Sequence, residues 1–320
     1  MKDLPGKTED GSTLLASVII PTYNRRAVLQ KCLLALAEQT APPHTYEVVV
    51  VDDHSSDDTA AMLDNLEMPY RLVRITMPRR TGPGGARNAG IKAAQAPIII
   101  FLDSDLIPAP TLVASHLAVH EGESRLIGHG PVIHTTDLDH PTATKMKVTD
   151  ISRAYFATGN VSIRKEHLLA AGLFDEDFVE YGWEDLELGR RLRRLKLKAV
   201  PVPEAKGYHY KPALRLFQLP ALIERERQRA RTAVIYYNKH PEKMVRYSIM
   251  LSPFFFWLDR LLHMGNWAEK PGAARLLERL ERAGRTGLLR FLVRLITHHA
   301  YFEELRHIIT PDHPARRWVR

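Results

Sequence analysis

A short apolar run that ends in two acids constrains this chain most. Residues 96–102 read APIIIFL, and Asp103-Ser104-Asp105 follows directly. A β-branched run this short, preceded by proline and closed by polar residues, predicts a buried strand of an α/β sheet. Open α/β sheets bind ligands at the carboxyl ends of such strands. Two carboxylates there can share one divalent cation, although an acidic strand end can also be an ordinary solvated loop.

Further strands and helices alternate along the first third of the chain. Apolar runs predict strands at 17–21, 47–53, 70–75 and 98–102, and helical spacing predicts helices at 26–39, 59–66 and 86–95. Residues 82–85 (GPGG) are expected to form a loop before the third helix. Strands too apolar to have an exposed face, alternating with helices, predict an α/β fold with a mostly parallel, Rossmann-like sheet flanked by helices.

The pattern loosens after this region. Residues 108–155 are interpreted as a long connection, followed by a strand at 158–163, helices at 165–171 and 185–195, and a terminal strand at 199–202. Beyond Pro212, helices are expected at 219–237, 244–262 and 273–306. We therefore predict a flexible N-terminus (1–14), a catalytic domain (15–211) and a helical C-terminal extension (212–320).

Composition narrows the cellular setting. The single cysteine, Cys32, excludes an internal disulfide and fits a reducing compartment. The polar start has no apolar signal core, and no apolar stretch is long enough to span a bilayer. These features predict a cytoplasmic protein. The net charge of +8 divides into −3 for residues 1–210 and +11 for residues 211–320, so the tail suits an acidic partner or an anionic surface.

Residues suited to a nucleotide follow several of the predicted strands. Pro21 and Tyr23 offer exposed backbone and an aromatic ring after the first strand, and Asp53 offers an acceptor for a base or a ribose after the second. Arg87 stands near the start of a helix, where a diphosphate would lie. Neither a phosphate-gripping loop ending in Gly-Lys-Ser/Thr nor a Gly-X-Gly-X-X-Gly fingerprint is present.

Four segments carry a resemblance when taken together. Ser17–Asn24, Val51–Asp57, Gly85–Gly90 and Leu102–Asp105 occur in this order, and the set resembles the family 2 glycosyltransferases of the GT-A fold over about residues 15–211. Gly182–Leu188 further resembles the C-terminal motif shared by β-1,4-galactosyltransferases and polypeptide N-acetylgalactosaminyltransferases. The Gln-X-X-Arg-Trp segment of the processive synthases is not reproduced, because Pro314 stands where its glutamine would be. A processive membrane polymerase is therefore not expected.

The resemblance implies a role for each matching residue. It assigns donor binding to Pro21, Tyr23, Asp53, Arg87, Asp103 and Asn160, metal binding to Asp105 and His209, acceptor binding to Trp183, and catalysis to Glu184 and Asp185. It implies a divalent metal, Mn²⁺ or Mg²⁺, and a nucleotide-sugar donor, most simply one linked to UDP. The acceptor would be a saccharide, a lipid-linked group or a protein, as in cell envelope polysaccharide synthesis.

The chemistry supports these roles independently of the resemblance. Displacing a nucleoside diphosphate from a sugar leaves negative charge on phosphate, which a metal and a cation stabilise. The attacking hydroxyl must lose a proton, so an inverting transfer needs one carboxylate base, for which Glu184-Asp185 at a helix start is the candidate. Each feature has a plainer alternative: Glu184 and Asp185 as a helix cap, Trp183 as a core residue, and His209 as a structural histidine.

Other functions remain as alternatives. A nucleotidyltransferase would carry a glycine-rich basic loop after the first strand, and residues 21–24 lack one. An inactive nucleotide-sugar-binding scaffold would not need Asp105, Asp185 and His209 together. No nucleic-acid-binding module is apparent in the basic tail. The apolar run 249–258 predicts a helical cap on the catalytic domain or a dimer contact. The alternative is peripheral contact with the inner face of a membrane, with Phe254, Phe255, Phe256 and Trp257 inserted and Arg225, Arg227, Arg229 and Arg231 facing lipid.

Overall fold

The computed structural model describes residues 13–152 and 154–319. The predicted flexible terminus therefore lies outside the described residues, apart from its last two positions. The chain divides into two compact units. The first contains residues up to Val179 together with Glu184–Pro212, and the second contains Glu180–Trp183 and the chain from Ala213 onward. The inclusion of residues 180–183 in the second unit has no signal in the sequence.

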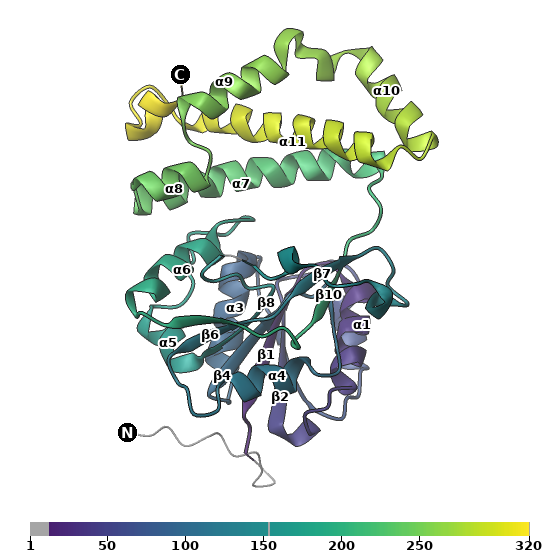
Figure 1. The fold of residues 1–320 in the computed structure, drawn as a ribbon, viewed down its shortest axis with the longest axis vertical. Helices are drawn as coiled ribbons and strands as arrows, with labels where there is room; N and C mark the ends of the chain where they lie inside the picture. Colours follow the sequence, from purple (N-terminus) through teal and green to yellow (C-terminus); the bar gives the residue numbers. More distant parts are fainter. Residues whose placement is uncertain (1–12, 153, 320) are drawn as a thin grey trace. The chain divides into compact units, whose positions relative to one another are not determined.

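A seven-stranded sheet forms the centre of the first unit (Figure 1), in the order β3-β2-β1-β4-β8-β6-β9. Its strands are β1 (Ala16–Thr22), β2 (Tyr46–Asp52), β3 (Arg71–Thr76), β4 (Ile98–Leu102), β6 (Leu126–His129), β8 (Asn160–Arg164) and β9 (Lys198–Pro201). The pairs from β3 to β4 are parallel, and β8 is antiparallel to both neighbours. Every residue of β2 and β4 is buried, as expected for strands covered on both faces.

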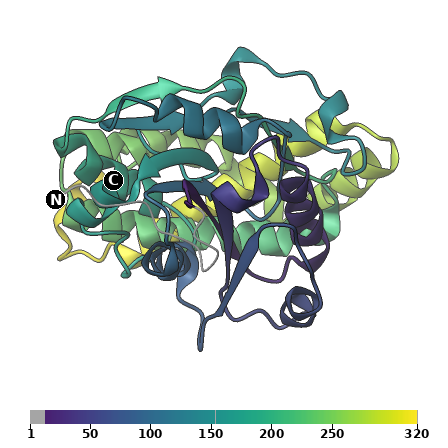
Figure 2. The same ribbon diagram turned by 90° about the horizontal axis from the view of Figure 1, so that it is seen from below.

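Helices cover both faces of this sheet, as the view from below also shows (Figure 2). One apolar core contains residues of α1 (Arg26–Ala37), α2 (Thr59–Asp64) and α4 (Leu112–Val119). The other contains residues of α3 (Gly82–Ala93), α5 (Lys165–Ala170) and α6 (Glu184–Arg194). The predicted α/β class, with a mostly parallel sheet between helices, is confirmed.

The interpretation of residues 108–155 as a long connection is wrong. This region contains α4, β6 and β7 (Val132–Thr135), and β7 belongs to a second sheet with β5 (Leu106–Pro108) and β10 (Gly207–Tyr210) in the order β5-β10-β7. The stretch around His209, expected to follow the last strand, is itself the central strand of this sheet. Strands of three or four residues with mixed polarity leave no periodicity that separates them from loops.

The glycine-rich segment before α3 was expected to be a loop and instead forms the first turn of that helix. Pro83 occupies the start of the helix, where a missing N–H costs nothing. Gly82 has a φ of +78°, and a Cβ built there would lie 2.2 Å from the carbonyl oxygen of Val179. Close backbone contact therefore explains the glycine, and the helix starts four residues earlier than predicted.

The second unit is helical, as predicted, but two of its three expected helices are divided. Its helices are α7 (Leu219–Lys239), α8 (Lys243–Ser248), α9 (Pro253–Leu262), α10 (Pro271–Arg282) and α11 (Thr286–Ile308). Pro253 starts α9, and Gly284, with a φ of +65°, separates α10 from α11. The long helices α7 and α11 lie side by side (Figure 1). No helix within the described residues is long and apolar enough to cross a membrane.

Candidate active site

The loops after β1 and β2 are joined to each other at the carboxyl edge of the sheet. Thr22 and Asp52 end these strands in register. The Asn24 side chain accepts a hydrogen bond from the backbone N–H of Ser56 at 2.7 Å, and the Asn24 N–H donates to Ser55 Oγ at 2.9 Å. Asn24 and His54 both have positive φ values, 52° and 66°. Such strained non-glycine residues persist only where surrounding contacts hold them, and they are common at functional sites.

Asp53, a predicted donor-binding residue, organises the next loop. Its carboxylate accepts hydrogen bonds from the backbone N–H groups of Thr81 and Gly82, at 2.7 and 2.9 Å, and from Thr81 Oγ1 at 2.8 Å. The side chain therefore ties the end of β2 to the start of α3. Tyr23 is 36% exposed, and the guanidinium of Arg80 lies 3.9 Å from its ring centroid.

The predicted metal-binding residues, Asp105 and His209, lie together with Asp103, which was predicted to bind the donor. Asp103, Asp105 and His209 each offer a ligand atom, and the three atoms lie within 4.8 Å of one another. His209 Nε2 is 3.0 Å from Asp105 Oδ1, and Arg25 donates to Asp105 Oδ2. This set of two carboxylates and one imidazole fits a divalent cation such as Mn²⁺. The Arg25 guanidinium shows that Asp105 already accepts a cationic partner.

The electrostatics keep Asp105 ionised. Burial alone would raise its pKa, but the hydrogen bond from His209 and the positive charge of Arg25 outweigh burial and lower the pKa to about 2. The carboxylate is therefore charged at neutral pH, and it needs no deprotonation before it binds a cation.

Arg87 connects the acidic pair at β4 with the acidic pair of α6. This nearly buried guanidinium donates from Nη2 to Asp103 Oδ1 and from Nη1 to Glu184 Oε1, both at 3.1 Å. Its Nε is buried without a hydrogen-bond partner. Arg87 and Asp103, both predicted to bind the donor, are thus in contact, and the arginine also reaches Glu184 of the candidate catalytic pair.

Glu184 and Asp185 begin α6. Because Glu184 is ion-paired with Arg87, Asp185 is the carboxylate of the pair without an arginine hydrogen bond of its own in the described site. Burial, followed by the neighbouring Glu184 charge, raises the pKa of Asp185 to about 7 against the opposing charge of Arg87. A carboxylate whose pKa lies near neutrality can both take and release a proton.

Trp183, predicted as an acceptor platform, is 8% exposed. Its indole N–H donates to the Arg229 carbonyl at 2.8 Å, and its ring stacks on Tyr236 at 6.3 Å between centroids, all within the second unit. Its φ is 71°, directly before Glu184. These contacts and the Arg229 guanidinium, 4.8 Å from the ring centroid, cover the ring and leave little of it for an acceptor sugar. Tyr181, two residues earlier, is the more exposed aromatic at 41%.

Asn160, predicted to bind the donor, is 3% exposed and fully engaged with protein groups. Its amide nitrogen donates to the carbonyls of Pro131 and Ala205, at 2.9 and 2.7 Å, and its Oδ1 lies 2.9 Å from His116 Nε2. Pro131 and Ala205 lie just before β7 and β10. Asn160 therefore positions the strands of the second sheet, one of which carries His209.

We predict that Asn160→Ala lowers stability. The substitution leaves two carbonyls and one imidazole nitrogen buried without partners, and each such group costs about 1–3 kcal/mol. Thermal unfolding should show a melting temperature lower by several degrees. Asn65→Ala, which removes a single exposed bond to the Ala61 carbonyl, is the matched control. An Asn160→Ala protein as stable as this control would contradict the positioning role.

Three further side chains border the site without having been singled out from the sequence. Arg25 directly follows the first motif, Ser17–Asn24, and this position next to the motif could have marked it as a site residue. Arg80 lies between the second and third motifs. His134, whose ring centroid is 5.3 Å from that of His209, pairs with it across β7 and β10. His134 was not predicted as a site residue because residues 108–155 were interpreted as a connection, whereas it lies in strand β7.

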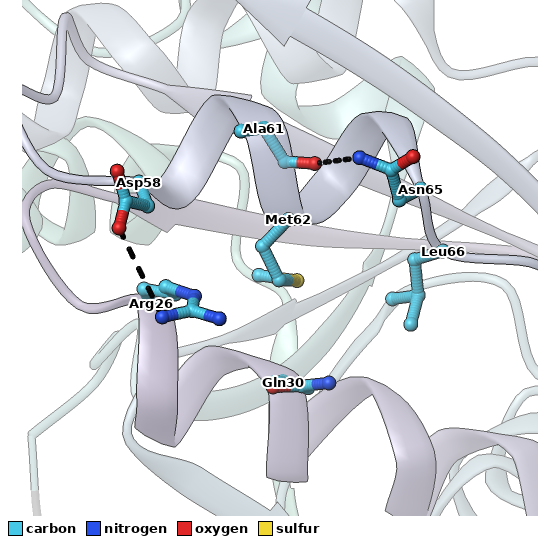
Figure 3. A pocket seen from close by; sticks show the side chains of 7 residues that line it. All are labelled: Arg26, Gln30, Asp58, Ala61, Met62, Asn65 and Leu66. Atoms are coloured by element: carbon cyan, nitrogen blue, oxygen red, sulfur yellow. Dashed lines mark hydrogen bonds and ion pairs between the residues drawn. The ribbon is translucent and has the colours of Figure 1, made fainter.

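A pocket of about 350 Å³ lies elsewhere, between α1 and α2 (Figure 3). Arg26 and Asp58 close one side of it with an ion pair at 3.9 Å, and Met62 and Leu66 supply its apolar wall. None of the predicted site residues lines this pocket, so it is separate from the cluster around Asp105.

Comparison with known proteins agrees with this geometry. Residues 17–171 match the family described as "Glycosyl transferase family 2". The matched segment contains β1 to β4 and both acids of the pair after β4. This segment, just under half of the chain, is similar to that family.

Relatives of this domain are named glycosyltransferases. Validoxylamine A glucosyltransferase of Streptomyces hygroscopicus subsp. limoneus is 34% identical over 230 residues, which cover 59% of this chain and 49% of the relative. Chondroitin synthase of Escherichia coli is 29% identical over 241 residues, 61% of this chain and 34% of the relative. The chain thus spans about half, or less, of the length of these two relatives.

Two solved structures share the fold. A mannosyltransferase from Pyrobaculum calidifontis in complex with GDP-Man and Mn²⁺ has a TM-score of 0.55 at 19% identity and covers 95% of this chain and 89% of that one. S. aureus TarS 1–349 in complex with UDP-GlcNAc has a TM-score of 0.55 at 18% identity and covers 92% and 90%. These likenesses confirm the predicted GT-A type of α/β fold.

Proposed function

We propose that this protein is a metal-dependent, inverting glycosyltransferase that moves a sugar from a nucleotide-diphospho-sugar to an acceptor hydroxyl. The observation that carries the proposal is the path from the Asp103, Asp105 and His209 cluster through Arg87 to Glu184 and Asp185. The metal-ligand cluster at one end can bind a divalent cation and the donor diphosphate. The carboxylates at the other end can take a proton from the acceptor hydroxyl. The helical extension is proposed to be a separate domain, with its boundary near residue 211.

Each end of this path has a defined chemical task. Asp103, Asp105 and His209 would hold Mn²⁺ or Mg²⁺, which supplies charge stabilisation to the departing diphosphate. Arg87, held between two carboxylates, adds a fixed positive charge beside that group. Asp185 accepts the proton of the attacking hydroxyl, and Glu184 keeps Arg87 oriented. Gly182–Leu188, the segment resembling galactosyltransferases and N-acetylgalactosaminyltransferases, supports the base role.

The donor is proposed to be linked to UDP. Of the two proteins with a similar fold, one is in complex with UDP-GlcNAc and the other with GDP-Man. The nucleotide of the donor could therefore carry uracil or guanine, and we propose uracil. Tyr23 and Asp53 are proposed to contact the nucleoside, since they follow the first two strands. The acceptor is proposed to be a saccharide, a lipid-linked group or a protein.

A thermal-shift panel tests the donor. UDP, GDP, CDP and ADP are each added to the full chain with and without Mn²⁺. Because ligand that binds only the folded state stabilises it by mass action, we expect UDP to raise the melting temperature, and more so with Mn²⁺. A rise with GDP alone would move the proposal to a GDP-linked donor. No rise with any nucleotide would overturn the glycosyltransferase assignment.

Peripheral contact with an anionic membrane is proposed for the second unit. On α9, Phe254 and Trp257 are 60% and 56% exposed, whereas Phe256 is fully buried and cannot insert. Arg231 pairs with Glu180, Glu224 and Glu304, and Arg229 pairs with Glu226, so neither of these two is free for lipid. The exposed Phe254 and Trp257, within a region of net charge +11, remain able to contact the surface of an anionic membrane.

We predict that the full chain sediments with anionic vesicles and that salt weakens this binding, since each basic residue near such a surface contributes about 1 kcal/mol. Phe254→Ser with Trp257→Ser should reduce pelleting at least about tenfold. Leu34→Ser with Leu169→Ser, which changes two exposed apolar residues of the first unit, should leave it unchanged. Equal pelleting of both double variants would exclude α9 as the contact.

A further inference from the structure

A second group of metal-ligand side chains lies within the second unit, between α9 and α11. Asp259, His263 and His299 each offer a ligand atom, all within 4.8 Å of one another. Asp259 lies on α9 and His263, four residues later, is the C-cap residue of that helix, so the two side chains leave on the same face. His299 comes from α11, which contacts α9. The group therefore joins two helices that meet only through tertiary packing.

The three side chains are already drawn together around one carboxylate oxygen. His299 Nδ1 lies 2.9 Å and His263 Nδ1 lies 3.4 Å from Asp259 Oδ1. The two imidazole rings are nearly parallel, with centroids 4.0 Å apart. Asp259 is 4% exposed and His263 is 6% exposed. Burying this much polar surface between two helices is costly unless the groups are satisfied.

One of these groups is not satisfied. Nδ1 of His263 also lies 3.1 Å from the Asp259 carbonyl, yet Nε2 is buried and has no hydrogen-bond partner. The ring is enclosed further by Trp267, which stacks on it at 5.9 Å. An orphaned imidazole nitrogen in so closed a place calls for an explanation. Nε2 carries the lone pair when Nδ1–H donates to the Asp259 carbonyl, so a cation would offset the cost of burying this nitrogen only by binding Nε2 itself.

Charged side chains around the three residues orient them. Arg306 Nη2 donates to Asp259 Oδ2 at 2.6 Å and leaves Oδ1 facing the imidazoles. Glu303 Oε1 lies 3.6 Å from His299 Nε2, on the far side of the ring from Asp259. Carboxylates that hold the second nitrogen of a metal-binding imidazole fix its orientation and raise its basicity.

We propose that Asp259, His263 and His299 form a zinc site that clamps α9 to α11. Two imidazoles and one carboxylate suit zinc, which favours nitrogen ligands, whereas the two carboxylates of the Asp105 cluster suit manganese or magnesium. The two imidazole rings must turn out of their nearly parallel stack for one metal ion to lie in the plane of each, and water completes the tetrahedron. This site is independent of the proposed transfer chemistry, since none of its residues belongs to the first unit.

Cobalt and zinc titrations of the full chain test the site after treatment with a chelator. Co²⁺ reports coordination by visible absorption, and we expect bands that one equivalent of Zn²⁺ displaces. Zinc at a hundredfold excess over its Kd should raise the melting temperature by about 5–10 °C. His299→Gln should lose both the bands and the shift. Glu303→Gln, at an exposed outer position, should weaken zinc affinity about tenfold.

Matched variants separate this site from others. His307→Gln changes an exposed histidine of the same helix and should leave the zinc response unchanged. Asp105→Ala should also leave it unchanged. If wild type shows neither bands nor a zinc-dependent shift, or if His299→Gln keeps them, the proposal is wrong. Loss of the response in Asp105→Ala alone would assign the zinc to the other cluster and likewise overturn it.

Discussion

Asp185→Asn is expected to lower the turnover number about 10²-fold or more while leaving nucleotide affinity nearly unchanged. The amide keeps the shape of the side chain but cannot accept the proton of the attacking hydroxyl, and general-base contributions are of this size. Release of nucleoside diphosphate from the sugar donor measures the effect even with water as acceptor, because water must lose a proton in the same way.

The matched control is Glu184→Gln, which changes the neighbouring carboxylate. It removes the ion pair with Arg87, so it should weaken diphosphate binding more than Asp185→Asn does. Normal turnover of bound donor by Asp185→Asn, together with slow turnover by Glu184→Gln, would transfer the base role to Glu184.

The pH dependence of the wild-type rate provides an independent reading of the same group. The pKa of Asp185 is raised to about 7 by burial and by Glu184, so the carboxylate is largely protonated below that pH and ionised above it. A base acts only when ionised, and the rate should therefore rise with pH through this region. Asp185→Asn should remove the rising limb. Asp105 does not create such a limb, because its pKa is lowered to about 2.

The strands buried on both faces could be predicted from the sequence with the sharpest bounds. The four valines of β2 and the isoleucines of β4 form continuous apolar runs, and their ends agree with prediction to within one or two residues. The strands of the second sheet could not be predicted. His134 and His209 lie in strands of four residues with polar members. These segments become strands only through pairing with distant parts of the chain, β7 with β10 and β10 with β5.

The site residues divide in a similar way. Asp103, Asp105 and Arg87 stand beside long predicted elements, so their meeting follows from the topology. The contacts of Asn160 could not be predicted from the sequence, since its partners at Pro131, Ala205 and His116 lie 29 to 45 residues away. Trp183 was misleading for a related reason: an aromatic next to two acids suggests a sugar platform, but α7 supplies the groups that cover it.

Asp105→Ala is expected to abolish metal-dependent transfer, with a loss of at least about 10³-fold. Asp105 is the acid in contact with both His209 and Arg25, so its removal leaves His209 and Asp103 as the remaining donors of the cluster. Electrostatic stabilisation of the leaving diphosphate is worth about 10²–10³-fold for a single donor group, and loss of a cation costs more. Nucleoside diphosphate release with and without EDTA measures the effect, and titration with Mn²⁺ measures the affinity.

Asp58→Ala supplies the matched control, because the exposed side chain of this aspartate forms a 3.9 Å ion pair with Arg26 beside the pocket between α1 and α2. It should keep both activity and the Mn²⁺ requirement. Asp105→Ala should also remain folded, since the substitution releases Arg25 to solvent rather than leaving a buried charge unpaired; its melting temperature without metal checks this. Full activity of Asp105→Ala in EDTA would show that the cluster of Asp103, Asp105 and His209 holds no catalytic cation, and the positive charge at the diphosphate would then have to come from Arg25 and Arg87.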